Sequence, residues 1–218
     1  MKPVKFIITC AMSIGLIFSA SAFSAAVNIT SRMESVTVKH GGKMIKIMRN
    51  QNQKHTVNPA FAKTSRKCPP FCIQPAVLAP GVDTIGEIEV LDYLAKMANG
   101  DDSILVIDSR TPDWVAKGTI PGAVNIPWTR LDPAKGADPI SIGEILEGSF
   151  GAQNLEGLWD FSKAKTLVMF CNGMWCGQSP NNVKNLLKFG YPAYKIKWYR
   201  GGMQDWEILG LTTAKLVN

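Results

Sequence analysis

Short apolar runs alternate with amphipathic stretches along most of the chain. Four runs rich in β-branched and aromatic residues predict strands, at residues 104–107, 123–126, 166–170 and 194–198. Around them, apolar residues recur at helical spacing within 85–98, 181–189 and 203–209. Strands that alternate with helices in this way predict an α/β fold, in which helices cover both faces of a parallel sheet.

Capping signals refine these elements. Thr84 and Glu87 have the spacing of a capping box, which predicts the start of the first helix, and Asn99-Gly100 predicts its end. Thr111-Pro112 predicts a brief helix that carries Trp114. Residues 141–147 are expected to form a short helix, and residues 148–165 a long surface connection.

The first 26 residues have the order of a secretory signal peptide. Lys2 and Lys5 precede a mostly apolar run over residues 6–20, and small residues follow up to Ala26. We therefore expect residues 1–26 to be a signal peptide and the protein to be periplasmic. The run is shorter than the roughly 20 apolar residues of a spanning helix, and an uncleaved membrane anchor is the alternative.

Residues 27–83 are expected to form an N-terminal extension. Alternating apolar residues on both sides of Gly41-Gly42 predict a β-hairpin with a tight turn. A polar linker follows over residues 50–67 and ends at Cys68-Pro-Pro-Phe-Cys72. His40 and His55 are expected to be exposed turn residues rather than bases.

The chain has 24 basic and 17 acidic residues, a formal net charge of +7, and loss of residues 1–26 would leave +5. Much of the excess lies in residues 39–67, which contain no Asp or Glu. This pattern favours a solvated basic face, with at most a weak attraction to a membrane surface. No nucleic-acid-binding motif accompanies the charge, so no nucleic-acid partner is expected.

Four of the five cysteines lie beyond residue 26, as two close pairs. Export places them in an oxidising compartment. For Cys68 and Cys72, a structural disulfide and a redox relay to the second pair are both open. The spacings are not typical of a zinc site, so neither metal nor cofactor is expected.

Cys171 lies where a predicted strand ends and a loop leads to a predicted helix. Ser179 and Pro180 have the order of an N-cap followed by the first helical residue. Free N–H groups and the positive end of the helix dipole converge at such a position. The position therefore favours a thiolate or persulfide anion on Cys171.

Four motifs, in order, resemble those of the rhodanese-like (sulfurtransferase) domain family. They are residues 105–110 (LVIDSR), residues 118–127 (GTIPGAVNIP), Cys171 itself, and residues 199–206 (YRGGMQDW) followed by 209–211 (LGL). The match spans about residues 84–213, so residues 84–218 are expected to be the rhodanese-like domain. The resemblance implies a five-stranded parallel sheet with helices on both faces.

The resemblance also implies a chemistry. Cys171 would attack the sulfane sulfur of a donor, become a persulfide, and pass the outer sulfur to a thiophilic acceptor. Asp108 and Arg110 match positions that support the site. The persulfide cradle would be formed by Asn172, Gly173, Met174, Trp175, Gly177 and Gln178.

This loop differs from the common family pattern in two ways. It has no Arg or Lys to bind an anionic donor, and Arg110 or Lys117 could supply that charge from outside it. It also contains a second thiol, Cys176. Cys176 is either a resolving thiol that forms a disulfide with Cys171, or a passive or structural residue.

These observations predict a periplasmic sulfurtransferase or persulfide carrier that acts through Cys171. Its partners would be a small sulfur donor, such as thiosulfate or polysulfide, and a thiol or protein acceptor; the sequence does not define an oligomeric state. Two alternatives stay open: a non-enzymatic binding module that presents the cradle loop, and a thiol–disulfide redox protein that uses Cys171 and Cys176.

Overall fold

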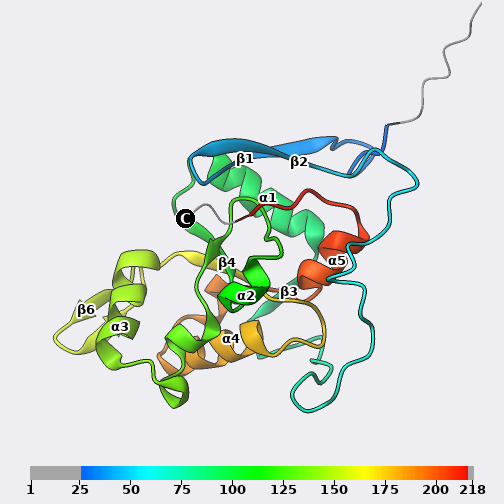
Figure 1. Cartoon of the computed structure of the whole chain (residues 1–218). Helices are drawn as coiled ribbons and strands as arrows, with labels where there is room; N and C mark the ends of the chain where they lie inside the picture. Colours follow the sequence, from blue (N-terminus) through cyan, green and yellow to red (C-terminus); the bar gives the residue numbers. More distant parts are fainter. Residues whose placement is uncertain (1–25, 216–218) are drawn as a thin grey trace, which may run out of the picture.

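The computed structural model describes residues 26–215 and is built around a five-stranded parallel sheet (Figure 1). The order across the sheet is β3 (Asp83–Ile85), β9 (Ile196–Tyr199), β8 (Thr166–Phe170), β4 (Ile104–Asp108) and β5 (Val124–Asn125). The expected α/β fold with a five-stranded parallel sheet is confirmed. The predicted signal peptide lies outside the described residues, except for Ala26.

Alternation along the strands sends side chains to two cores, one on each face of the sheet. In β8, Leu167 and Met169 enter one core, and Val168 and Phe170 enter the other. All four are fully buried, as expected for a central strand covered on both faces. β8 is thereby held rigidly, and so is the cysteine that follows it.

Helices cover both faces. On one face, α1 (Glu87–Ala98) and α5 (Gly202–Ile208) contribute Leu91, Leu94 and Trp206 to the core. On the other, α4 (Gln178–Lys188) and α3 (Pro139–Glu144) contribute Val183, Leu186 and Ile142. The remaining helical segments are α2 (Pro112–Val115), η1 (Trp128–Leu131), η2 (Pro133–Lys135), η3 (Ile145–Ser149) and η4 (Ala193–Lys195). None of the helices within residues 26–215 has both the length and the apolar character needed to cross a bilayer.

The predicted hairpin is present as β1 (Ser35–His40) and β2 (Lys43–Met48), joined at Gly41 and Gly42, whose φ angles are 54° and 78°. Its inner face, formed by Val36, Val38 and Ile47, is part of the α1 core. The hairpin therefore packs as part of the domain, as Figure 1 shows above α1. The expectation for His40 was wrong: it is 7% exposed, and Nδ1 accepts from the Gly122 N–H at 3.1 Å.

The start of α1 differs from the prediction. Thr84 lies in β3, so the sheet begins one residue before the expected domain boundary, and the helix is capped two residues later than expected. The Gly86 N–H donates to Glu89 Oε2 at 2.9 Å. The pairing of β3 with β9 outweighs the local capping signal.

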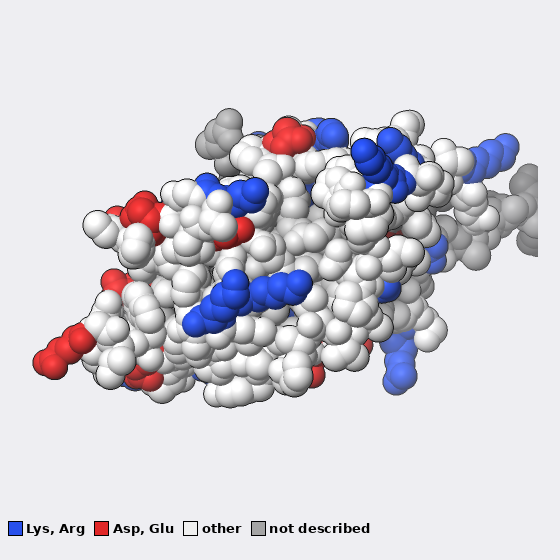
Figure 2. Space-filling model, turned by 90° about the horizontal axis from the view of Figure 1, so that it is seen from below, with Lys and Arg blue, Asp and Glu red and all other residues white. Residues whose placement is uncertain are grey.

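The long connection expected over residues 148–165 contains its own hairpin, β6 (Gln153–Leu155) and β7 (Leu158–Asp160). Phe150 and Phe161, near the two ends of this connection, are buried, so the connection does not lie entirely on the surface. On the face drawn in Figure 2, acidic side chains gather at the end that bears α3 and β6, and basic ones are interspersed among uncharged residues elsewhere.

Candidate active site

Cys171 directly follows β8 and is 2% exposed. The loop after it is short, because α4 begins at Gln178 with Gly177 as its cap residue. The prediction that Ser179 caps this helix was therefore wrong. Ser179 lies in the first turn, and its hydroxyl donates to Cys171 Sγ at 3.1 Å. The indole N–H of Trp198 donates to the same hydroxyl oxygen at 3.1 Å, which directs the hydroxyl proton toward the sulfur.

The surroundings of Cys171 stabilise its thiolate. Burial raises the pKa of the thiol, but hydrogen bonds from the Cys176 thiol, the Ser179 hydroxyl and the N–H groups of Ser179 and Gly173 outweigh it and lower that pKa to about 7. The N-terminus of α4 adds its dipole in the same sense. A substantial fraction of the molecules would thus carry an anionic sulfur at neutral pH.

The surroundings of Cys176 have the opposite effect and disfavour its thiolate. Burial and the neighbouring Cys171 raise the pKa of Cys176 well above that of an ordinary thiol, although the N–H groups of Asn172 and Gln178 act against them. A negative charge is thus favoured on Cys171 over Cys176. Cys176 keeps its proton and donates a hydrogen bond to the charged sulfur.

The first turn of α5 binds the backbone carbonyls at the start of the cradle loop. The N–H groups of Met203 and Gln204 donate to the carbonyls of Cys171 and Asn172, each at 3.0 Å. Gly202 makes this approach feasible: its φ is +56°, and a Cβ there would overlap the Cys171 carbonyl oxygen and lie 2.8 Å from the Gly173 nitrogen. With these two carbonyls bound outside, the N–H of Gly173 can face the sulfur.

Asp108 and Arg110 lie beside the loop as a buried ion pair. Arg110 Nε donates to Asp108 Oδ1 at 2.9 Å and Nη2 donates to Oδ2 at 2.6 Å. Arg110 Nη1 also donates to Asn172 Oδ1 at 3.3 Å, and Thr119 Oγ1 donates to Asp108 Oδ2 at 2.7 Å. Arg110 is fully buried and its donors bind protein atoms, so it supports the loop and does not face a substrate.

A cavity of about 380 Å³ opens over the Cys176 side of the loop. Four aromatic residues are among those that line it, which are Pro70, Phe71, Trp114, Trp128, Asn172, Trp175, Cys176, Gly177, Gln178 and Asn181. The cradle residues Met174 and Trp175 thus have separate roles: the Trp175 ring forms a wall, and the Met174 carbonyl accepts from the Gln74 N–H at 2.7 Å.

The N-terminal linker brings a basic residue to this site that sequence reasoning missed. The guanidinium carbon of Arg66 lies 3.8 Å from the centre of the Trp175 ring and 5.7 Å from that of Trp114. Burial lowers the pKa of the Arg66 guanidinium, and its electrostatic interaction with the nearby Cys176 only partly offsets this effect. Lys117, one of the two expected sources of charge, stacks on Trp114 at 3.8 Å.

Cys68 and Cys72 are joined by a disulfide, and both line a second, more open hollow of about 800 Å³ beside Trp175. The disulfide encloses Phe71, whose ring lies 5.6 Å from the Trp175 ring in an edge-to-face contact. Arg200 Nη2 donates to the Gln74 carbonyl at 2.8 Å. Nothing in the local sequence of the linker marks these contacts, because they are formed only by tertiary packing.

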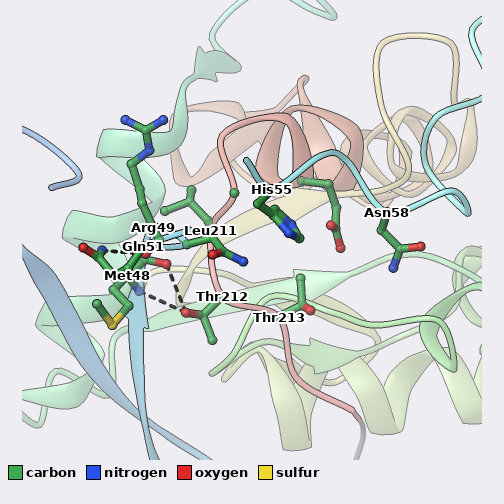
Figure 3. Close-up of a pocket in the computed structure, with 11 residues that line it drawn as sticks. Met48, Arg49, Gln51, His55, Asn58, Leu211, Thr212 and Thr213 are labelled. Atoms are coloured by element: carbon green, nitrogen blue, oxygen red, sulfur yellow. Dashed lines mark hydrogen bonds between the residues drawn. The ribbon is translucent and has the colours of Figure 1, made fainter. Parts of the chain in front are cut away.

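A third cavity lies away from these residues, and none of the expected site residues lines it (Figure 3). There, Thr212 is tied to β2: its N–H and hydroxyl donate to the Met48 carbonyl at 3.0 and 3.1 Å. The exposed His55 also lines this cavity. It contains no cysteine, so sulfur chemistry points to the Cys171 site. Within residues 26–215, no three His, Cys, Asp or Glu side chains are placed to hold a metal ion together.

A family model described as the rhodanese-like domain matches residues 90–209. Among solved structures, a thiosulfate sulfurtransferase from Pseudomonas aeruginosa is 17% identical, with 62% of this chain and 20% of that chain covered and a TM-score of 0.41. A human single-domain sulfurtransferase is 22% identical, with 57% and 95% covered and a TM-score of 0.36. A rhodanese-like domain from an Anabaena species is 16% identical, with 63% and 81% covered and a TM-score of 0.39. No curated protein matches the chain significantly.

We expect Gly202→Ala to distort the cradle, because the added Cβ would overlap the Cys171 carbonyl. The cost should exceed the ~1–3 kcal/mol of an unfavourable φ alone. Gly136→Ala is the matched control, since Gly136 has a φ of +90° with open space around it. Urea unfolding would measure both variants, and equal destabilisation would show that the close approach at Gly202 is unimportant.

We expect Ser179→Ala to raise the pKa of Cys171 above its value of about 7, because the sulfur anion loses a hydroxyl donor. The thiolate fraction at pH 7 should fall about three- to tenfold. Ultraviolet thiolate absorbance against pH would measure it, with Cys171→Ser as the blank and Ser103→Ala as the remote control. An unchanged titration would mean that the hydroxyl does not stabilise the thiolate.

Proposed function

Because the chain belongs to the rhodanese-like domain family, we propose that it moves sulfane sulfur from a donor to a thiophilic acceptor through a persulfide on Cys171. The observation that carries the proposal is the environment of Cys171, where a buried sulfur has a pKa of about 7 through the Ser179 hydroxyl and inward N–H groups. The same donors would stabilise the terminal sulfur of a persulfide, which is also an anion.

In the loading step, the Cys171 thiolate attacks the sulfane sulfur of the donor. A new sulfur–sulfur bond forms on Cys171, the bond within the donor breaks, and the leaving group departs with that electron pair. From thiosulfate the leaving group is sulfite. In unloading, an acceptor thiolate attacks the outer sulfur, and Cys171 leaves as a thiolate that its hydrogen bonds again stabilise.

In this scheme the main role of Cys176 is to donate a hydrogen bond, because burial and the neighbouring Cys171 keep its thiol protonated. Resolution remains open to it: its thiolate could attack the inner sulfur, form a Cys171–Cys176 disulfide and release hydrosulfide. That disulfide would need an external dithiol to return to the starting state. The interaction of the two buried thiols also favours thiol–disulfide redox chemistry as a second candidate function.

The periplasm is the proposed location. The order of residues 1–26 supports export, and a disulfide between Cys68 and Cys72 is the kind of bond that persists in an oxidising compartment. Cell fractionation together with N-terminal sequencing of the mature protein would test both export and cleavage.

We expect sulfur transfer from thiosulfate or polysulfide to a thiol or cyanide acceptor to rise with pH through a midpoint of about 7, because the deprotonated Cys171 is the nucleophile. Cys171→Ser should abolish transfer at every pH. Initial rates across this range would measure both. Full transfer by Cys171→Ser would contradict the proposal.

We expect the persulfide to survive about as long in wild type as in Cys176→Ala, because Cys176 holds its proton at neutral pH. Loaded protein would be sampled over time by intact mass in the absence of acceptor. A persulfide that lasts much longer in Cys176→Ala, with a Cys171–Cys176 disulfide accumulating in wild type, would instead establish Cys176 as a resolving thiol.

A further inference from the structure

The cavity of Figure 3, between the N-terminal linker and the end of α5, contains a buried acid that the proposed sulfur chemistry does not use. Its volume is about 410 Å³, and Glu207 from the last turn of α5 lines it. Glu207 is only 8% exposed, and it also lines an adjoining cavity of about 350 Å³ that shares His55 and Gly210 with the first. A buried carboxylate therefore faces a space large enough for an organic molecule.

No group in the described part of the chain pairs directly with this carboxylate. Within residues 26–215 no N–H or O–H group donates to it, and none of the ion pairs there includes it. Burial raises the pKa of Glu207, and attraction to His55 and Arg110 only partly offsets this effect. Arg110 is already paired with Asp108, and the carboxylate lies at the negative end of the α5 dipole. Because an unpaired buried charge is costly, a cationic ligand would stabilise this residue.

The walls of the cavity combine polar and apolar groups. Figure 3 shows Met48 and Leu211 toward one end of the cavity, and His55, Asn58 and Thr213 toward the other. A threonine hydroxyl can accept a hydrogen bond as well as donate one. The polar end thus suits a charged donor group, and the apolar end suits a short hydrocarbon chain.

Backbone hydrogen bonds fix these walls in the structure. The Asn50 N–H donates to the Gly210 carbonyl at 2.7 Å, and the His55 N–H donates to the Asn52 carbonyl at 2.8 Å. The bonds from Thr212 to the Met48 carbonyl hold the opposite side. A ligand would therefore enter a preformed site, which lowers the entropic cost of binding.

The other charged groups at the cavity leave the carboxylate available. Arg49 lines the cavity, but its Nε donates to the Leu209 carbonyl at 3.0 Å, and Figure 3 shows its side chain extending away from His55. A metal ion is a poorer match. Among the described residues that line the cavity, zinc would find one carboxylate and one imidazole, whereas it usually takes three or four protein ligands.

From this arrangement we propose that the cavity binds a small alkylammonium ion. Its ammonium group pairs with the Glu207 carboxylate and donates to the Thr213 hydroxyl, and its alkyl chain lies against Met48 and Leu211. The walls come from the linker and from the segment after α5, so the bound ion fastens these two parts of the chain together. Binding is noncovalent and does not involve Cys171, so the proposal does not rest on sulfur transfer.

The test is an NMR titration of the amide signals of the full chain at neutral pH with methylammonium, n-butylammonium, n-butanol and butyrate. We expect n-butylammonium to shift the signals of Gly210 and Thr213 saturably. Its Kd should be at least about tenfold lower than those of butanol and butyrate, which lack the positive charge. It should also be at least about tenfold lower than that of methylammonium, because the longer chain covers the apolar wall. Equal binding of butanol, or no saturable shift, would overturn the proposal.

Two variants test the named contacts. Glu207→Gln keeps the shape of the side chain and removes its charge, so it should raise the Kd for n-butylammonium at least about tenfold and leave that for butanol unchanged. Thr213→Val should raise the Kd about three- to tenfold without altering α5. Glu147→Gln, at an exposed position, is the matched control. Unchanged binding of n-butylammonium by a folded Glu207→Gln protein would exclude the site.

A lysine side chain of another protein would present the same charged group, and Nα-acetyl-lysine methylamide mimics it. We expect this probe to bind more weakly than n-butylammonium, because its two amide groups would have to lose water at the cavity mouth. Tighter binding of the lysine probe would overturn the assignment to a small molecule. None of these readouts depends on Cys171, so they can fail while sulfur transfer stands, and the reverse also holds.

Discussion

A buried sulfur anion at the end of β8 is the constraint on which the rest of the structure depends. Charge in an apolar interior is costly unless donors surround it. Here the Ser179 hydroxyl and the N–H groups of Gly173 and Ser179 provide them, and Trp198 orients that hydroxyl. The first turn of α5 binds two loop carbonyls from outside, which leaves the inward side of the loop to the donors. The sheet and both cores fix these parts rigidly.

The N-terminal linker contacts the site from outside the hydrogen bonds that surround Cys171. The linker descends from the hairpin along the α5 side of the molecule (Figure 1) and contacts the cradle loop through Gln74. Its residues Arg66 and Phe71 contact the Trp175 ring, and the Cys68–Cys72 disulfide closes the turn that contains Phe71. The charge that the cradle loop lacks is thus placed at its rim by a segment before the family-matched region.

Much of the fold could be predicted from the sequence, because strong periodic signals and four ordered motifs agree. β4, β8, α1 and the hairpin lie close to their predicted positions. The exceptions have a common cause. Thr84 joins β3 because β9 offers a partner strand, and Ser179 turns to Cys171 because a buried sulfur needs a donor more than the helix end needs a cap. At the site, Cys171 and its neighbours were accessible to local reasoning, whereas Arg66 was not, because its contact with Trp175 spans more than a hundred residues and leaves no periodic trace.

The most direct test of the central claim is to locate the sulfur. Wild-type protein would be loaded with polysulfide, its persulfides and thiols blocked by an alkylating agent, and its peptides mapped by tandem mass spectrometry. The account predicts one additional sulfur atom on Cys171, with Cys176 recovered as a thiol and Cys68 and Cys72 still bonded to each other. Additional sulfur on Cys176 or on the Cys68–Cys72 pair, with Cys171 unmodified, would contradict it.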